Sequence, residues 1–476
     1  MRARELSDTK RKLLATYLHG EQFCALPGLR RTSQGSPCLA PGQERMWRHS
    51  RQNPTLTCYN EPITIYRHGP LDVSVLQRSF IELTRRHESW RTTFCIEDGC
   101  PVQLVHPPAT ISVPITDVRD APLHQREDLA LLLASQQANI PFDLESGPLF
   151  RAQVIRIADN EYRIFITAHH LILDGVTVFN ILYPELTTIY GAFVDGKSNP
   201  LPDLPLQYGD FAQWQRQRAE GEFVRREIAY WRERLAGNSP PVQLPTDCAR
   251  PVRQTFSGSI SQFTVAKDLA DDVRRFSQEQ RVTLFVILEA AFVTLLNRYT
   301  GCEDITTGIV APGARKRSEF QKVMGLLQTW LPLRFDLTGN PTPIDLITHA
   351  RDVILEALSH DDVPFDVIAE DLQPKRDPIP NAFYTTMFSL EPSVPDFTPT
   401  WDFSTMDFSP GGARVDIFIE IDDRPADMLG HVQYNDRLFR PATIDRLTSN
   451  FQTILRHFVT NPQQQVSDLP RFDMTQ

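Results

Sequence analysis

Hydrophobic residues recur along this chain with two periods, one typical of helices and one typical of strands. Apolar side chains three and four residues apart predict helices, and alternating or β-branched runs predict strands. The predicted helices span residues 1–20, 71–88, 129–137, 176–194, 267–280, 284–298 and 441–458. The predicted strands span residues 62–67, 92–96, 149–157, 162–168, 255–265, 305–310, 331–336, 383–389, 414–422 and 429–434. Helices and strands therefore mix along the whole chain, which indicates an α/β fold.

A proline-rich stretch divides this pattern near its middle. Residues 199–205 read Asn-Pro-Leu-Pro-Asp-Leu-Pro, and a charged helix carrying Trp214 and Trp231 is predicted to follow as far as Leu235. Because proline cannot continue a helix or a central strand, this stretch favours a connection between two packed units. The 476 residues are enough for two such units. The chain is therefore predicted to have two α/β halves of similar size, joined near residues 200–235.

Composition argues against several classes of protein. The formal net charge is −10 and no block of Lys and Arg stands out, which gives a nucleic-acid role little support. No run of about eighteen apolar residues occurs, and the N-terminus lacks the apolar core of a signal peptide. A cytoplasmic protein without a membrane span is the resulting expectation. The seven cysteines are scattered without CxxC spacing, which favours free thiols over disulfides or a zinc site.

The strongest chemical motif contains His169, His170, Asp174 and Gly175, and it lies where a predicted strand ends and a helix begins. Strand ends that face a cleft are where α/β proteins place reacting groups. Histidine titrates near neutral pH, so it can accept a proton or orient an amine. The structural alternative is two buried histidines beside a helix-capping aspartate, and for a lone histidine that alternative prevails. The paired histidines with Asp-Gly at this offset favour a functional site.

A second motif imitates a phosphate-binding loop. Residues 191–198 read Gly-Ala-Phe-Val-Asp-Gly-Lys-Ser and fit the Walker A pattern. Such a loop needs a strand before it and a helix N-terminus after it. Here a predicted helix precedes the motif, and Pro200 and Pro202 block a helix after it. Nucleotide binding is therefore not expected.

The histidine motif resembles the HHxxxDG signature of condensation domains of nonribosomal peptide synthetases. Further segments resemble that family's motifs in order along the chain, at residues 42–47, 86–94, 208–214, 230–235, 324–334, 360–365 and 376–381. The resemblance extends over residues 38–470, nearly the whole chain. It implies two chloramphenicol-acetyltransferase-like lobes in a V-shaped pseudo-dimer with a central tunnel. Donor and acceptor carrier proteins would dock at opposite tunnel mouths.

The resemblance also assigns roles at the histidine motif. His170 would be the catalytic residue that deprotonates or positions the attacking amine. Gly175 would offer a backbone N–H near the reacting centre, and His169 would pack and hydrogen-bond. Asp174 would be structural, in a buried ion pair with Arg91.

Other residues of the family motifs are expected to support this centre. Asn381 and Ser389 are candidates to line the tunnel. Structural roles, within or between the lobes, are expected for Gln43, Arg45, Trp47, Tyr208, Trp214 and Arg334. No metal site and no covalently bound cofactor are expected, because substrates would arrive on 4′-phosphopantetheine arms or as CoA thioesters.

The implied boundaries divide the chain into four parts. An N-terminal helix and linker would occupy residues 1–37, the N-terminal lobe residues 38–205 and the C-terminal lobe residues 206–470. Residues 471–476 would begin a linker to an adjacent adenylation domain. The partners would be an acceptor peptidyl carrier protein and, as donor, acyl-CoA or an acyl carrier protein, with the chain itself a monomer. The short segment before the first motif favours a starter subtype that adds a fatty acyl group in lipopeptide biosynthesis.

Several positions depart from the family's commonest pattern, among them Gly42, Val176, Gln328 and Trp330, and these put the subtype in question. A cyclisation domain would carry aspartates in place of the two histidines, so that variant is excluded. Two other functions stay open. One is a stand-alone CoA-dependent O- or N-acyltransferase acting on free small molecules. The other is a non-catalytic module that docks carrier proteins or partner enzymes, against which the intact His170 argues.

Overall fold

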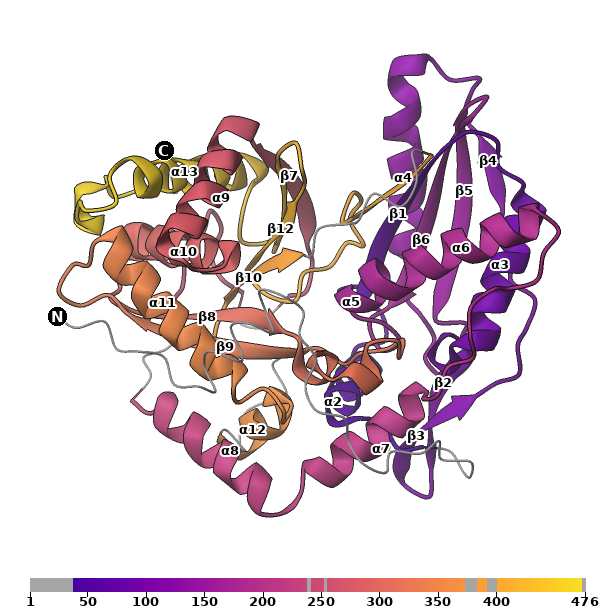
Figure 1. Cartoon of the computed structure of the whole chain (residues 1–476), viewed down its shortest axis with the longest axis horizontal. Helices are drawn as coiled ribbons and strands as arrows, with labels where there is room; N and C mark the ends of the chain where they lie inside the picture. The colour runs from indigo at the N-terminus through magenta and orange to yellow at the C-terminus, as the bar shows by residue number, and fades with distance from the viewer. Residues whose placement is uncertain (1–36, 238–240, 252–254, 373–382, 392–399, 473–476) are drawn as a thin grey trace.

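Two mixed α/β lobes, each built on its own β-sheet, spread apart as a V (Figure 1). The computed structural model describes residues 37–237, 241–251, 255–372, 383–391 and 400–472. The helix predicted at residues 1–20 and the predicted tunnel residue Asn381 lie outside these residues. The two lobes agree with the predicted pair of α/β halves.

The N-terminal lobe contains a five-stranded sheet in the order β11-β1-β6-β5-β4. These strands are β1 (Asn60–His68), β4 (Ile115–Asp117), β5 (Phe150–Ala158), β6 (Glu161–His169) and β11 (Trp401–Thr405). Alternate residues of β5 and β6 enter two different apolar clusters. One cluster includes residues of α3 (Val73–Arg86) and α6 (Tyr183–Val194), and the other includes α4 (Arg126–Ala138). Helices therefore cover both faces of this sheet, and a hairpin of β2 (Thr92–Glu97) and β3 (Cys100–Val105) stands beside it.

The C-terminal lobe contains a six-stranded sheet in the order β7-β13-β12-β10-β8-β9. These strands are β7 (Ser259–Val265), β8 (Asp304–Ala311), β9 (Thr329–Asp336), β10 (Thr386–Glu391), β12 (Ile417–Asp423) and β13 (Met428–Tyr434). Its helices are α9 (Lys267–Gln280), α10 (Leu284–Thr300), α11 (Pro343–Leu358) and α13 (Pro441–Thr460). Among the described residues no single helix is long and apolar enough to span a membrane. The pair α9 and α10 reaches that length and apolar composition only when taken together, and the two helices are bent by 108° relative to each other.

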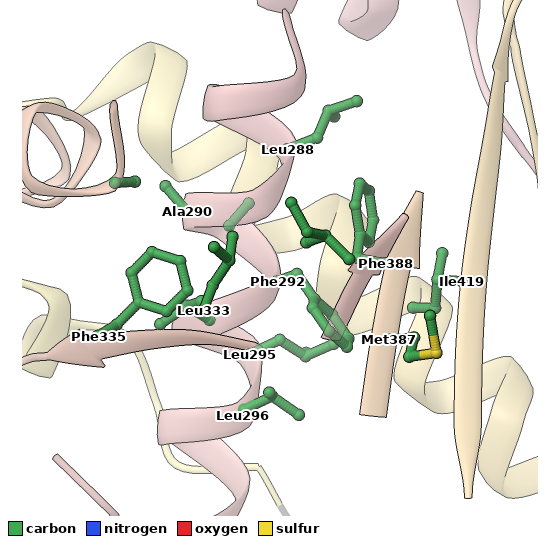
Figure 2. Packing of buried hydrophobic residues seen from close by; sticks show 14 of the residues in the cluster. Leu288, Ala290, Phe292, Leu295, Leu296, Leu333, Phe335, Met387, Phe388 and Ile419 are labelled. Atoms are coloured by element: carbon green, nitrogen blue, oxygen red, sulfur yellow. The ribbon is translucent and has the colours of Figure 1, made fainter. Parts of the chain in front are cut away.

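Strand alternation gives the C-terminal sheet two different faces. Ile417, Ile419 and Ile421 of β12 are completely buried in the core beside α10. Figure 2 shows Phe292 of α10 beside Phe388 of β10, and their ring centroids lie 5.4 Å apart. Because side chains alternate along a strand, the residues between these positions point away from the helices, toward the N-terminal lobe.

The base of the V is made by α7 (Tyr208–Arg218) and α8 (Gly221–Arg234), which run from one lobe to the other (Figure 1). The prediction of one continuous helix through Trp214 and Trp231 is wrong, because the chain turns between them at Gly221, where φ is +82°. Glycine adopts this left-handed conformation without steric cost. Near this base lie α2 (Pro41–Gln52) and α12 (Phe365–Leu372), which contact each other.

Two segments of the C-terminal half cross into the N-terminal lobe. The strand β11 pairs antiparallel with β1, with Phe403 opposite Ile65. Residues 312–328, between β8 and β9, reach the short helix α5 (Gly175–Thr177) and bond to it through Gly325 and Gln328. The division predicted at residue 205 therefore does not separate the two sheets by sequence, since one strand of the N-terminal sheet comes from beyond it.

Candidate active site

His170 directly follows the last residue of β6, and its neighbours fix its ring. Its backbone N–H donates to the Tyr59 carbonyl at 2.8 Å, which continues the pairing with the β1 side of the sheet. The ring Nδ1 lies 2.7 Å from the Leu173 carbonyl oxygen, and a carbonyl can only accept, so Nδ1 carries the proton. Burial lowers the pKa of His170, which favours the neutral ring. The Nε2 lone pair is therefore available to accept a proton.

Two cavities meet at this imidazole. The first cavity lies between the lobes, and its lining includes Glu61, Val178, Phe179, Met387, Glu391, Arg414, Val415, Phe418 and Glu420. The second cavity is lined on the α2 and α12 side by Gly42, Arg45, Met46, Gln215, Pro364 and Asp366. His170, Leu326, Gln328 and Trp330 line both cavities. The ring, although its residue is only 7% exposed, is thus accessible from both cavities.

Asp174 is completely buried at the start of α5, where it accepts six hydrogen bonds. Two come from the guanidinium of Arg315, at 2.9 and 3.1 Å. Two come from the backbone N–H and hydroxyl of Thr177, and two from the backbone N–H groups of Leu327 and Gln328. Burial acts to raise the pKa of Asp174, but Arg315 and these donors outweigh it and hold the pKa below its usual value.

The prediction that Arg91 is the partner of Asp174 is wrong. Arg91 lies near the end of α3, where it pairs with Glu88 at 3.4 Å and donates to the carbonyl oxygens of Thr84 and His106. The true partner, Arg315, comes from the crossing segment of the other lobe, 141 residues further along the chain. The Asp174–Arg315 pair therefore joins the two lobes close to His170.

His169, directly before His170 in the chain, has different surroundings. The His169 ring packs near Tyr59 and Phe142, with centroids 5.9 and 6.1 Å apart, and its Nδ1 accepts the backbone N–H of Leu171. Burial, together with the neighbouring His170, lowers the pKa of His169 to about 3, so this ring is neutral. It takes part in packing on the side away from the two cavities.

Gly175 leaves space for neighbouring residues, and its backbone N–H already has an acceptor. Its backbone N–H was expected to face the reacting centre, but it donates to the Gln328 side chain oxygen at 3.0 Å. A Cβ added at this position would lie 3.2 Å from Glu391 Oε2 and 3.5 Å from Gln328 Oε1. The absence of a side chain therefore lets the crossing segment and β10 approach the histidine motif closely.

An ion pair missed by the sequence analysis lies beside His170. The Arg414 guanidinium donates to Glu61 Oε1 at 2.9 Å, and the same oxygen lies 3.8 Å from His170 Nε2. Arg414 also lies over the ring of Trp330, 5.2 Å from its centroid. Glu61 comes from β1 and Arg414 from the C-terminal half, so this pair forms only when both lobes are in place. A carboxylate at this distance favours the protonated imidazole whenever it forms.

Two further carboxyl groups in the first cavity were also missed. Glu391 Oε1 accepts the Ser389 hydroxyl at 2.9 Å, and Glu420 Oε1 accepts the Thr405 hydroxyl at 2.9 Å. Burial raises the pKa of Glu391 to about 7 and that of Glu420 well above its ordinary value. Ser389, predicted to line the tunnel, is not part of the cavity lining and acts through its bond to Glu391.

The other motif residues brace this centre. Gln43 donates to the Leu171 carbonyl at 2.8 Å, and Arg45 pairs with Asp366 of α12. The Tyr208 hydroxyl donates to the Leu326 carbonyl at 2.8 Å. Further packing or ion pairs join Trp214 to Phe320 and Arg334 to Asp304, while Trp47 is buried in the core of the N-terminal lobe. Among the residues that the structure describes, no group of three or more His, Cys, Asp or Glu side chains could hold a metal ion.

The family model described as condensation domain matches residues 33–475, nearly the whole chain. This chain belongs to the condensation-domain family. The condensation domain is 36% identical over 436 residues to a component of the linear gramicidin synthase of Brevibacillus parabrevis. It is 33% identical over 442 residues to surfactin synthase subunit 1 of Bacillus subtilis (strain 168). These alignments cover 91% and 90% of this chain but only 6% and 12% of the relatives, so the chain corresponds to a small part of each relative.

Solved structures share the fold of this condensation domain. The first condensation domain of the calcium-dependent antibiotic synthetase superposes with a TM-score of 0.82 at 17% identity, over 93% of this chain and 100% of that one. The X-domain from teicoplanin biosynthesis gives 0.80 at 22% identity, over 94% and 100%. The expected chloramphenicol-acetyltransferase-like condensation fold of a nonribosomal peptide synthetase is thereby confirmed. Amide bond formation is the reaction of this family.

Proposed function

We propose that this domain joins a carrier-bound acyl thioester to the amine of an aminoacyl group on a second carrier protein. One observation carries the proposal: two cavities of different lining both reach a single neutral imidazole, that of His170. Each cavity would receive the end of one reacting chain. The likeness to segments of multi-domain peptide synthases supports delivery of both chains on phosphopantetheine arms, next to an adenylation domain.

The chemistry follows from the state of the imidazole. The α-amine, with a pKa of about 8, is partly neutral at neutral pH, so orientation and one proton acceptor suffice. His170 Nε2 accepts an N–H of the amine while the nitrogen attacks the thioester carbonyl carbon. The tetrahedral intermediate collapses to an amide and a thiolate, and the thiolate leaves with the proton as the free thiol. Glu61, 3.8 Å from Nε2, stabilises the imidazolium between these steps.

Three kinds of acyl donor can be compared directly. Acyl carrier protein, peptidyl carrier protein and acyl-CoA each present the same thioester, and acyl-CoA would define the starter subtype. The assay therefore offers all three donors with one aminoacyl carrier acceptor and measures the amide product by mass spectrometry. Turnover of a free amine without any carrier would instead identify a stand-alone acyltransferase.

Replacement of the imidazole tests the assignment. We expect His170→Ala to lower the single-turnover rate by about 10²–10⁴-fold, the range for a positioned acid–base group. His124→Ala, at an exposed histidine of the same lobe, is the matched control and should keep the wild-type rate. Circular dichroism and thermal unfolding establish that both variants fold. A His170→Ala domain with the wild-type rate would refute the proposal.

A further inference from the structure

Two neighbouring strands place carboxyl groups on the same face of the C-terminal sheet. β10 and β12 pair in parallel, with Ser389 opposite Glu420 and Glu391 opposite Asp422. The even positions of β12 point away from the helical core, and Phe418 and Glu420 line the first cavity. On β10, Met387 and Glu391 line the same cavity. The sheet itself thus aims Glu391 and Glu420 at the space beside His170.

These two carboxyl groups lack the cation that buried acids usually have. Glu61, the third acid of the cavity, already pairs with Arg414. Glu420 is 9% exposed and Glu391 is half-buried, and within the described part of the chain neither forms an ion pair. Each accepts one hydroxyl hydrogen bond at Oε1, and the described residues offer no donor to either Oε2. The raised pKa values of both groups reflect this burial without a cation.

The remainder of the cavity is apolar. Val178, Phe179, Met387, Val415 and Phe418 contribute side chains to it. A purely apolar substrate would fill this space but leave the Oε2 atoms of Glu391 and Glu420 without a donor, which is unfavourable. A long side chain with a methylene stem and a cationic end would pack its stem against the apolar residues and place its cation beside Glu391 and Glu420.

We propose that the first cavity takes a substrate side chain ending in a primary amine or guanidinium, as in lysine, ornithine or arginine. This inference rests on the proposed function, in which the cavity holds one of the two joined chains. The reacting α-amine has a different place, at His170 Nε2, beside the ion pair of Glu61 and Arg414. Glu391 and Glu420 thus bind the side chain and select it.

The test compares cationic side chains with neutral chains of nearly the same shape. Arginyl is paired with citrullinyl, and lysyl with norleucyl, each as a pantetheine thioester. One arm varies the acceptor against an acetyl donor, and the other varies an N-acetylated donor against a glycyl acceptor. A charge-assisted hydrogen bond lost with the neutral analogue corresponds to about a tenfold to hundredfold effect. We therefore expect kcat/KM to favour the cation by about tenfold or more in one arm, which identifies the chain that enters the first cavity.

Variants locate the preference. Glu391→Gln and Glu420→Gln keep the shape of each side chain. Each variant should bring the ratio of kcat/KM for the cationic substrate to kcat/KM for the neutral substrate closer to one. Glu289→Gln is the matched control, because Glu289 is a completely buried glutamate of α10 outside the cavity, and it should leave the ratio unchanged. A ratio measured within each variant is insensitive to differences in the amount of folded protein.

Binding of unreactive amide analogues separates this inference from the proposed function. Isothermal titration of arginyl-aminopantetheine against citrullinyl-aminopantetheine should show the same preference without turnover. If the cation binds preferentially but no amide ever forms, the cavity assignment holds and the proposed function fails. If amides form at equal rates from charged and neutral side chains in both arms, the inference is overturned while the proposed function stands. The carboxyl groups would then serve the α-amine that all acceptors share.

Discussion

Substitution of Asp174 by Asn should weaken the contact between the lobes at a cost that the structure allows us to work out. The amide keeps the shape of the carboxylate but loses its charge and turns one of the two oxygens into a donor. Oδ1 accepts from Thr177 twice and from Arg315 once, and Oδ2 accepts from Arg315, Leu327 and Gln328. Whichever oxygen becomes the NH₂ group, it therefore faces three donors.

The lost charge adds a second cost. The Arg315 side chain is 3% exposed and keeps only carbonyl and hydroxyl acceptors once Asp174 is neutral. Removing one partner of a buried ion pair typically costs about 3–5 kcal/mol. We therefore expect Asp174→Asn to lower the free energy of unfolding by roughly 3–5 kcal/mol. An Asp174→Leu and Arg315→Met double variant removes both charges and should cost less than the sum of the two single variants.

Urea unfolding monitored by intrinsic fluorescence measures these differences. The matched control is Asp304→Asn, which breaks the ion pair with Arg334 at a site where the two side chains are 34% and 24% exposed. That substitution should cost about 1 kcal/mol or less, because water screens the pair. A loss for Asp174→Asn no larger than for Asp304→Asn would refute the claim that the buried pair holds the lobes together.

Two further substitutions test other parts of the core. The pKa of Glu289 is raised by burial from 4.5 to about 8, so folding takes up a proton and stability falls as pH rises between these values. Glu289→Gln should therefore raise the free energy of unfolding by about 1 kcal/mol at pH 5 and about 4 kcal/mol at pH 8, and a pH-independent difference in urea titrations would contradict this. Gly325 has φ +148°, and its added Cβ would lie 1.9 Å from Tyr208 Cδ2. Gly325→Ala should cost about 3 kcal/mol or more in thermal unfolding, against about 1 kcal/mol for Gly339→Ala, where no atom lies within 4 Å, and equal costs would argue against the close contact.

Local sequence pattern predicted most of the secondary structure. The helix expected at residues 267–280 has those bounds in α9, and the two strands that precede the histidine motif were placed within one residue at each end. The helix α11 was missed although Thr342 and Asp345 form a capping box with Pro343 between them, a signal the sequence carries. The break at Gly221 was missed because the charged pattern continues on both sides of it.

The sequence predicted only the part of the site that lies at the end of a single strand, β6. His170 and Asp174 follow β6 directly, so their position is local. Arg315 was out of reach because no periodicity relates residues 141 positions apart. Glu420 was within reach, since the alternation Ile-Glu-Ile in β12 indicates a polar residue on the non-helical face, but which lobe that face meets is a matter of topology.

The geometry at His170 therefore depends on how the lobes meet more than on the motif itself. The segment that carries Leu326, Gln328 and Trp330 lines both cavities, and Asp174 bonds to its backbone at residues 327 and 328. A shift of this segment would change both cavities at once, without moving the imidazole. The histidine motif singles out the imidazole in the sequence, whereas the register of β10 and β12 and the position of the crossing segment decide which side chains can lie beside it. Substrate choice should accordingly respond to substitutions at Glu391 and Glu420 that leave the histidine motif intact.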